Sequence, residues 1–254
     1  MKILFVFILC LLMHSCARKE CKIEIGSLLF DKYIISWGDI FLGEEKTEMI
    51  KLYNPTENKI NIKGVFDYSC FYISDRTHEP EKWYTTGIDI MPNSYDSLFI
   101  SFLTNDTTIL GYYRKELRFT LDGQEQYQHL AMDAHVVENF ASMTQDELRN
   151  APVVKVDSNE YDLGSMYAGE KKSVSFVIKN EGRLPLIIRK IQTTCGCTVA
   201  TPDKKVINSG QSTSIEVTFR ARGKQGKQHK TITMFCNDPR QPVVTFAIQC
   251  FIQN

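Results

Sequence analysis

The sequence has no excess of either charge, since its 254 residues include 30 Lys and Arg and 30 Asp and Glu. Such a chain lacks the broad positive field by which nucleic-acid-binding proteins attract phosphates, and it carries no strongly acidic tail. The charge is nevertheless uneven. Residues 16–140 hold 13 basic and 20 acidic residues, net −7, and residues 141–254 hold 16 and 10, net +6. Either the two halves attract each other, or the second half faces an anionic partner.

Long apolar runs are also missing. The N-terminal run Ile3–Met13 has 11 residues, about half of what a membrane-spanning helix needs, but it suits the core of a signal peptide. Ser15-Cys16 follows and resembles a loose bacterial lipobox. We therefore predict a signal peptide over residues 1–15 and a lipidated Cys16 that begins a tether through residue 29. A plain secretory signal is the alternative.

The segment after Cys16 also bears on localisation. It reads Ala17-Arg18-Lys19-Glu20 and contains no run of acidic residues. In related bacteria, such an acidic run tends to mark export to the cell surface. We therefore expect a lipid-anchored protein of the bacterial cell envelope, on the periplasm-facing side of the outer membrane.

Motifs that carry catalysis are absent as well. The sequence contains no HExxH, no GxSxG and no glycine-rich phosphate loop between a strand and a helix. The four histidines after Cys16 do not lie at metal-ligand spacing from one another; they are His78, His129, His135 and His229. We therefore expect neither an enzyme nor a cofactor.

One internal repeat organises the chain. Trp37-Gly38-Asp39-Ile40-Phe41-Leu42-Gly43-Glu44 matches Leu163-Gly164-Ser165-Met166-Tyr167-Ala168-Gly169-Glu170 at an offset of 126 residues, and Asn54 matches Asn180 at the same offset. Farther along, the offset falls to 117, which indicates a nine-residue insertion between Cys70 and Ile90 of the first copy. The chain therefore contains two copies of one module.

Each copy reads as a series of short strands. Residues 173–178 and 213–219 alternate polar and apolar side chains, and Asn, Gly and Pro interrupt the series at regular places. This pattern predicts an all-β protein with β-sandwich domains at residues 30–137 and 152–254. Thr144 and Glu147 match a capping box, so we expect a linker with a short helix at residues 138–151.

The second copy resembles a known family. The motifs that carry the resemblance are Tyr161-Asp162-Leu163-Gly164, Thr193-Thr194-Cys195-Gly196-Cys197-Thr198 and Cys236-Asn237-Asp238-Pro239. In this order they resemble domain-of-unknown-function family 1573, most strongly over residues 159–251. The resemblance implies two tandem immunoglobulin-like sandwiches in an exported bacterial protein, with a divergent first copy, and it implies no activity.

Cys195 and Cys197 are the sharpest local feature. They could pack as small apolar side chains, form a disulfide, or act as a redox pair or soft-metal ligands. If residues 237–242 close a hairpin, the residues that pair across it have numbers that sum to about 478, which places Cys250 near the Cys195–Cys197 loop. The polar–apolar alternation of the two strands then directs the Cys250 side chain into the core and the His229 side chain to solvent. Because two bonded cysteines so close in sequence would close a very small ring, we expect free thiols, at least one of them packed inside the sandwich.

Two further groups are candidate binding surfaces. Arg220, Arg222, Lys224 and Lys227 cluster around an expected hairpin turn, with Lys204 and Lys205 expected nearby. They either protect a strand edge or contact an anionic partner. His78, Trp83 and Tyr84 lie in the insertion and either bind a partner or cover their own core.

The sequence thus predicts a membrane-anchored, non-catalytic module that binds an unknown protein or glycan. We expect no binding of nucleic acid, because no aromatic residues that could stack on bases lie among the basic residues. A thiol-redox or metal protein that uses Cys195 and Cys197 is one alternative. A sandwich-type assembly factor that lends a strand edge is another.

Overall fold

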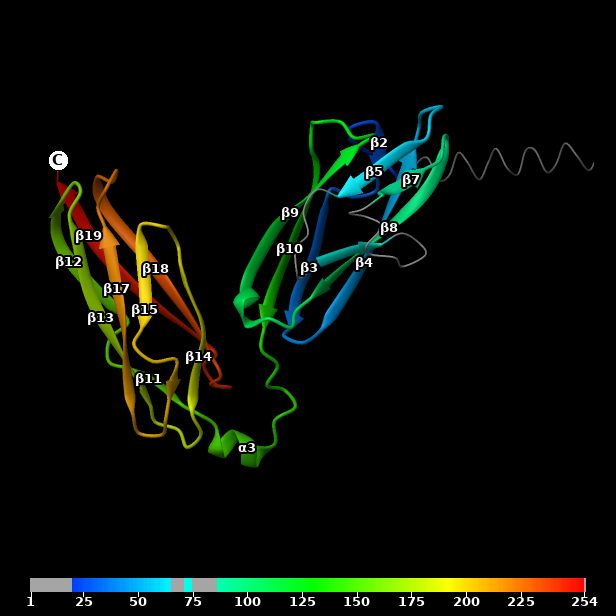
Figure 1. Ribbon diagram of the computed structural model, residues 1–254. Coiled ribbons are helices and arrows are strands. Elements are labelled where there is room, and N and C mark those ends of the chain that lie inside the picture. Colours follow the sequence, from blue (N-terminus) through cyan, green and yellow to red (C-terminus); the bar gives the residue numbers. More distant parts are fainter. Residues whose placement is uncertain (1–19, 65–70, 75–85, 254) are drawn as a thin grey trace, which may run out of the picture. The chain divides into compact units, whose positions relative to one another are not determined.

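A computed structural model of the chain describes residues 20–64, 71–74 and 86–253 (Figure 1). Within these residues the regular secondary structure is almost entirely β-strand, and the chain divides into two compact units, an N-terminal unit that ends at Val137 and a C-terminal unit that begins at Glu138. In this part of the chain, no helix has the length and apolar character to cross a membrane.

The N-terminal unit contains two five-stranded sheets, with strand orders β1-β2-β4-β8-β6 and β3-β10-β9-β5-β7. Phe30 and Phe119 come from opposite sheets, and their ring centroids lie 6.0 Å apart in the core between them. The strands are β1 (Ile23–Ile25), β2 (Leu28–Phe30), β3 (Ile34–Phe41), β4 (Glu45–Asn54), β5 (Ile60–Gly64), β6 (Phe71–Ser74), β7 (Ile88–Ile90), β8 (Ser94–Leu103), β9 (Gly111–Leu121) and β10 (Gln128–Val137), with a 3₁₀ turn η1 at Thr107–Ile109.

The C-terminal unit contains a four-stranded sheet, β11-β13-β17-β15, and a five-stranded sheet, β12-β19-β18-β14-β16. Phe176 and Phe246 face each other from the two sheets, with ring centroids 4.8 Å apart. The strands are β11 (Val154–Val156), β12 (Glu160–Tyr167), β13 (Lys171–Asn180), β14 (Leu186–Thr193), β15 (Thr198–Pro202), β16 (Val206–Ile207), β17 (Ser212–Arg220), β18 (Gly226–Cys236) and β19 (Val243–Gln253).

The two units repeat one topology. In each, an early strand runs parallel to the last strand of its sheet, β3 with β10 and β12 with β19, while the other strand pairs are antiparallel. The pair β4–β8 corresponds to β13–β17, and β5–β9 corresponds to β14–β18. The predicted all-β fold with two immunoglobulin-like sandwiches is confirmed.

The repeated glycine has the same structural role in both units. Gly38 and Gly164 adopt φ of +63° and +66°, a conformation that strains any residue with a Cβ. At each glycine the parallel pairing slips by one residue, so β3 and β12 both carry a bulge. The bulge in β12 lies opposite Gln249–Phe251 of β19.

Asn54 and Asn180, which match in the repeat, make the same hydrogen bonds to the backbone inside their units. Asn180 is fully buried; its Nδ2 donates to the carbonyls of Leu184 and Ile207 at 2.8 and 2.9 Å, and its Oδ1 accepts the N–H of Gly182 at 2.9 Å. Asn54 is equally buried and bonds in the same manner, to the carbonyls of Asn58 and Ile90 and to the N–H of Thr56. Burying such an amide is tolerated because its polar atoms are paired.

One short helix, α3 (Gln145–Asn150), begins the C-terminal unit. Thr144 and Glu147 form the reciprocal capping box that the sequence predicts. The helix buries none of its own residues, which is consistent with a connecting role.

The predicted tether is wrong in its second half. Residues 22–29 belong to the N-terminal unit, where β1 and β2 form a hairpin and β2 pairs with β4. Cys21 is 2% exposed and Leu28 is fully buried. The reason is the apolar alternation of this segment around a turn at Gly26, which gives it a core-facing side.

The predicted register of the last hairpin is confirmed. Gln228 lies opposite Cys250 and Gly226 opposite Ile252, so paired numbers sum to 478. Cys250 is therefore 6% exposed and faces the core, whereas His229 is exposed. Cys236 is buried at the other end of the same strand.

Candidate functional site

Four cations lie around the turn between β17 and β18, at one end of the C-terminal unit. We call Arg220, Arg222, Lys224 and Lys227 the basic tip. Three are exposed and Lys224 is half-buried, and the structure gives none of them an ion pair among the residues it describes. The turn is closed by the N–H of Lys224, which donates to the carbonyl of Ala221 at 3.1 Å. The tip therefore presents its charge to solvent.

Two exposed aromatic rings lie beside the basic tip. Tyr167 ends β12 and is 59% exposed, and Phe251 near the end of β19 is 53% exposed. Phe251 lies directly opposite Lys227 in the strand pairing. Large aromatic side chains are enriched at protein–protein interfaces.

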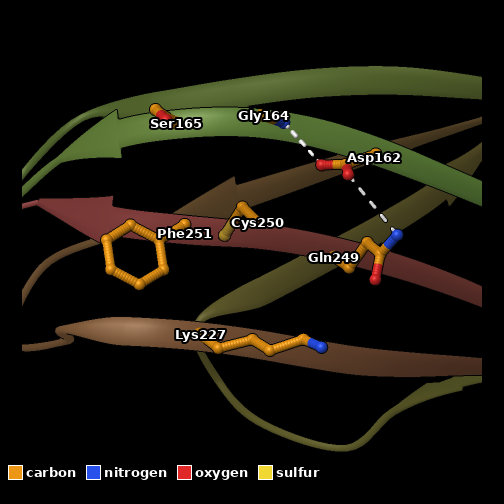
Figure 2. A pocket seen from close by; sticks show the side chains of 7 residues that line it. All are labelled: Asp162, Gly164, Ser165, Lys227, Gln249, Cys250 and Phe251. Atoms are coloured by element: carbon orange, nitrogen blue, oxygen red, sulfur yellow. Dashed lines mark hydrogen bonds between the residues drawn. The ribbon is translucent and has the colours of Figure 1, made fainter.

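A hollow of about 330 Å³ opens beside Phe251 on the outer side of the β12-β19-β18 sheet. Figure 2 shows Phe251 and Lys227 on neighbouring strands, with Asp162 across from them. The Asp162 carboxylate accepts the N–H of Gly164 at 2.7 Å and the Nε2–H of Gln249 at 3.4 Å. Phe251 also lines a second hollow of about 480 Å³, together with Gln225, Gly226, Ile252 and Gln253. The hollows carry both hydrogen-bonding groups and an apolar ring.

The edges of the sheets show whether the lysines of the basic tip could also protect a strand edge from pairing. β14 pairs with β18 only over residues 232–236, so within the described residues no strand flanks Gly226–Lys230 on that side. Lys227 and Lys230 lie in this unflanked stretch, where lysines oppose edge-to-edge pairing. The outer strands β11, β15 and β16 have three, five and two residues, and the eight-residue β12 is broken by its bulge.

The cysteine pair differs from our expectation. Cys195 and Cys197 form a disulfide with a Cα–Cα distance of 5.3 Å, so the prediction of free thiols is wrong. The reason is the turn at Gly196, which folds the two Cα atoms back to a separation well within the usual range for disulfides. Cys250 does not take part; it is a free, buried thiol. Both bonded cysteines are half-buried.

The disulfide loop connects the two sheets of the sandwich. It leaves β14 at Thr193 and enters β15 at Thr198, and its backbone is bonded on both sides. The N–H of Thr194 donates to the carbonyl of Thr231 at 3.1 Å, and the N–H of Arg220 donates to the carbonyl of Cys197 at 3.0 Å. The loop and the basic tip therefore lie at the same end of the unit.

The other thiols in the described residues are shielded. Burial raises the pKa of Cys236 from 9.0 to about 11. Burial and then the carboxylate of Asp31 raise the pKa of Cys21 to about 11, and burial raises the pKa of Cys250. No three His, Cys, Asp or Glu side chains in the described parts of the chain gather as a group that could hold a metal ion.

Several predicted residues lie elsewhere. Lys204 and Lys205 are at the opposite end from the basic tip, because the carbonyl of Lys205 accepts the N–H of Ile188, which pairs with Cys236. The prediction that they join the tip is therefore wrong. Cys16, His78, Trp83 and Tyr84 lie outside the described residues.

Tyr167 and Phe251 were missed from the sequence. The signal was available for Phe251, because the alternation that turns Cys250 inward turns its neighbour outward. The alternation shows only that the Phe251 ring points away from the core. Whether another strand or loop covers the ring depends on the three-dimensional structure.

Comparison with known proteins identifies the family of this unit. Residues 154–250 match the family model DUF1573, described as a protein of unknown function. The C-terminal unit contains a DUF1573 domain. The basic tip and the disulfide loop both belong to this domain, and the resemblance found in the sequence is confirmed for it. No curated protein matches the chain.

Many solved structures match the chain, among them the following two. A crystal structure of a protein of unknown function from Porphyromonas gingivalis W83 has 19% sequence identity and a TM-score of 0.56, over 89% of this chain and 100% of that one. It supports the fold. An ASH/PapD-like domain of human CEP192 is similar at 11% identity and a TM-score of 0.36, over 46% of this chain and 95% of that one, a likeness too distant to bear on function.

Proposed function

We propose that the protein is a lipid-anchored binding protein of a bacterial cell envelope, held by Cys16 on the periplasm-facing side of the outer membrane. The short apolar run and Ser15-Cys16 support export and anchoring. Each sandwich provides a non-catalytic scaffold, and loops on such scaffolds commonly carry binding residues.

The DUF1573 domain binds an acidic protein through the basic tip together with Tyr167 and Phe251. The observation that carries this proposal is the gathering of four cations without ion pairs around one turn, next to two exposed rings. Arginine forks bind carboxylates in a bidentate manner, and Arg with large aromatic residues is the composition enriched at protein interfaces. Uncompensated positive charge also speeds encounter with an acidic surface.

Two matched triple variants test the surface. The first, R222A/K224A/K227A, removes charge from the tip, and the second, K155A/K204A/K205A, removes three exposed lysines elsewhere in the same unit. Both lower the net charge by three, so a general charge effect acts on them equally. In affinity purification from native envelopes, we expect the partner to be lost with the first variant and kept with the second. Capture by the unmodified protein should weaken as salt rises.

Three results would count against the proposal. Equal loss with both variants indicates only non-specific attraction, and capture that persists with the first variant shows that the tip is not the surface. Capture that survives protease treatment of the envelopes but not glycan degradation indicates an anionic glycan instead. Phe251→Ala is a second probe, expected to weaken capture roughly tenfold while leaving the fold intact, since the ring is half exposed.

A further inference from the structure

The disulfide between Cys195 and Cys197 contributes little to holding the fold together. It bridges residues only two positions apart, and the entropy that a cross-link removes from an unfolded chain grows with the size of the loop it closes. The same loop is already fixed by backbone hydrogen bonds to Thr231 on one side and Arg220 on the other. The N–H of Thr198 also donates to the carbonyl of Cys195 at 3.2 Å, which closes the turn without the sulfur bridge.

The bond is open to approach from solvent. Both cysteines are half-buried, and Gly196 between them is exposed. Apart from Gly196 and its two chain neighbours, Cys195 and Cys197, no atom lies within 4 Å of the place where a Cβ on Gly196 would stand. A partner residue can therefore reach the loop across the glycine.

Redox chemistry in the described part of the chain is confined to this pair. The three free cysteines found there, Cys21, Cys236 and Cys250, are all buried. Burial disfavours the thiolate, which is the form that attacks disulfides. The half-buried pair can thus exchange without scrambling into bonds with these three cysteines.

We propose that Cys195 and Cys197 form a thiol–disulfide exchange site that accepts two electrons from a partner protein with a solvent-exposed pair of cysteine thiols. A thiolate of the partner attacks Cys195 Sγ, the Cys195–Cys197 bond breaks, and its electron pair leaves on Cys197 as a thiolate. The second partner thiolate then attacks the partner sulfur of this mixed disulfide and releases Cys195. The partner becomes a disulfide, and its two protons end on Cys195 and Cys197. This site does not depend on the partner of the basic tip.

Two contacts assign different roles to the two sulfurs. Cys197 packs partly against the hydrophobic core, so Cys195 is the sulfur that a partner reaches. Thr198 Oγ1 lies 3.6 Å from Cys195 Sγ, and since a sulfur in a disulfide carries no hydrogen, the hydroxyl is the donor. A hydrogen bond to Cys195 Sγ stabilises the thiolate that the second step releases. Cys195 is thus the sulfur that forms the mixed disulfide with the partner, and Cys197 is the leaving thiolate of the first step.

The first test uses the complete mature protein in detergent, equilibrated with mixtures of reduced and oxidised glutathione without denaturant and then alkylated. We expect two thiols to appear together as the mixture becomes more reducing, while the circular dichroism spectrum stays unchanged. Cys250→Ala is the matched control and should show the same midpoint. A bond that opens only in denaturant, or a fold that is lost on reduction, would overturn the proposal.

The second test assigns the roles. With oxidised glutathione, Cys197→Ser should form a glutathione adduct at Cys195 at least tenfold faster than Cys195→Ser forms one at Cys197. Thr198→Val should slow the adduct at Cys195 several-fold, whereas Thr193→Val, whose hydroxyl donates only to the carbonyls of Cys195 and Thr198, should not. Equal rates for the two serine variants would refute the assignment of Cys195.

Discussion

Replacing Asn180 with alanine should destabilise the C-terminal unit and leave the N-terminal unit unchanged. The substitution removes an amide that is fully buried and joins four backbone groups. Its Oδ1 accepts the N–H groups of Gly182 at 2.9 Å and Val153 at 3.3 Å. Its Nδ2 donates to the carbonyls of Leu184 and Ile207.

The magnitude follows from the groups left without partners. Carbonyls tolerate the loss of one bond better than N–H groups do, so the two orphaned N–H groups dominate. Each costs about 1–3 kcal/mol when buried, which gives about 2–6 kcal/mol for the substitution. Because the urea dependence of the unfolding free energy is about 1–3 kcal/mol per M for small domains, the unfolding midpoint should fall by about 0.7 M urea or more.

Buried cysteines allow each unit to be followed separately. Cys236 reports unfolding of the C-terminal unit and Cys21 that of the N-terminal unit, since both are at most 2% exposed. Thiol labelling in urea, resolved by peptide mass, gives a midpoint for each. Asn180→Ala should shift only the Cys236 midpoint, and Asn54→Ala only the Cys21 midpoint.

The surface control is Asn208→Ala, which replaces an exposed asparagine of the same unit and should change stability by less than about 0.5 kcal/mol. The reasoning is refuted if Asn180→Ala costs less than about 1 kcal/mol. It is equally refuted if Asn54→Ala lowers the Cys236 midpoint as much as Asn180→Ala does, because the two networks would then not be separate.

Four further predictions can be checked directly. Cys16→Ser should move the protein from the membrane to the soluble fraction, and unchanged membrane association would contradict the anchor. Replacing Cys195 and Cys197 together with alanine should cost only about 1–2 kcal/mol in urea unfolding, because the closed loop is so short. Limited proteolysis should cut first within residues 138–151, where the helix buries none of its residues. Because the folded state raises the pKa of Cys236 from 9.0 to about 11, its contribution to stability is complete below pH 9 and is lost as pH rises toward 11. Urea midpoints should show this fall, and Cys236→Ala should reduce it, leaving the part that comes from the raised pKa of Cys250.

The sequence alone determined the features that depend on local pattern. Polar–apolar alternation predicted strands, and the repeat predicted two copies of one module and aligned Gly38 with Gly164 and Asn54 with Asn180, whose shared roles the structure then showed. The turn before Pro242 set the register of β18 and β19 and hence the inward direction of Cys250. Such features are readable because side-chain direction has a period of two along a strand and a tight turn fixes which residues face each other.

Only the tertiary structure decided which residues meet across the fold. Neighbours in sequence gave no sign that Arg220 lies next to the Cys197 backbone, or that Lys205 is at the other end of the unit. The pairing of Cys195 with Cys197 rather than with Cys250 required the distance between Cα atoms in a particular turn. These contacts depend on how one sheet is placed over the other, which is set by packing of the whole core and not by any short stretch of chain.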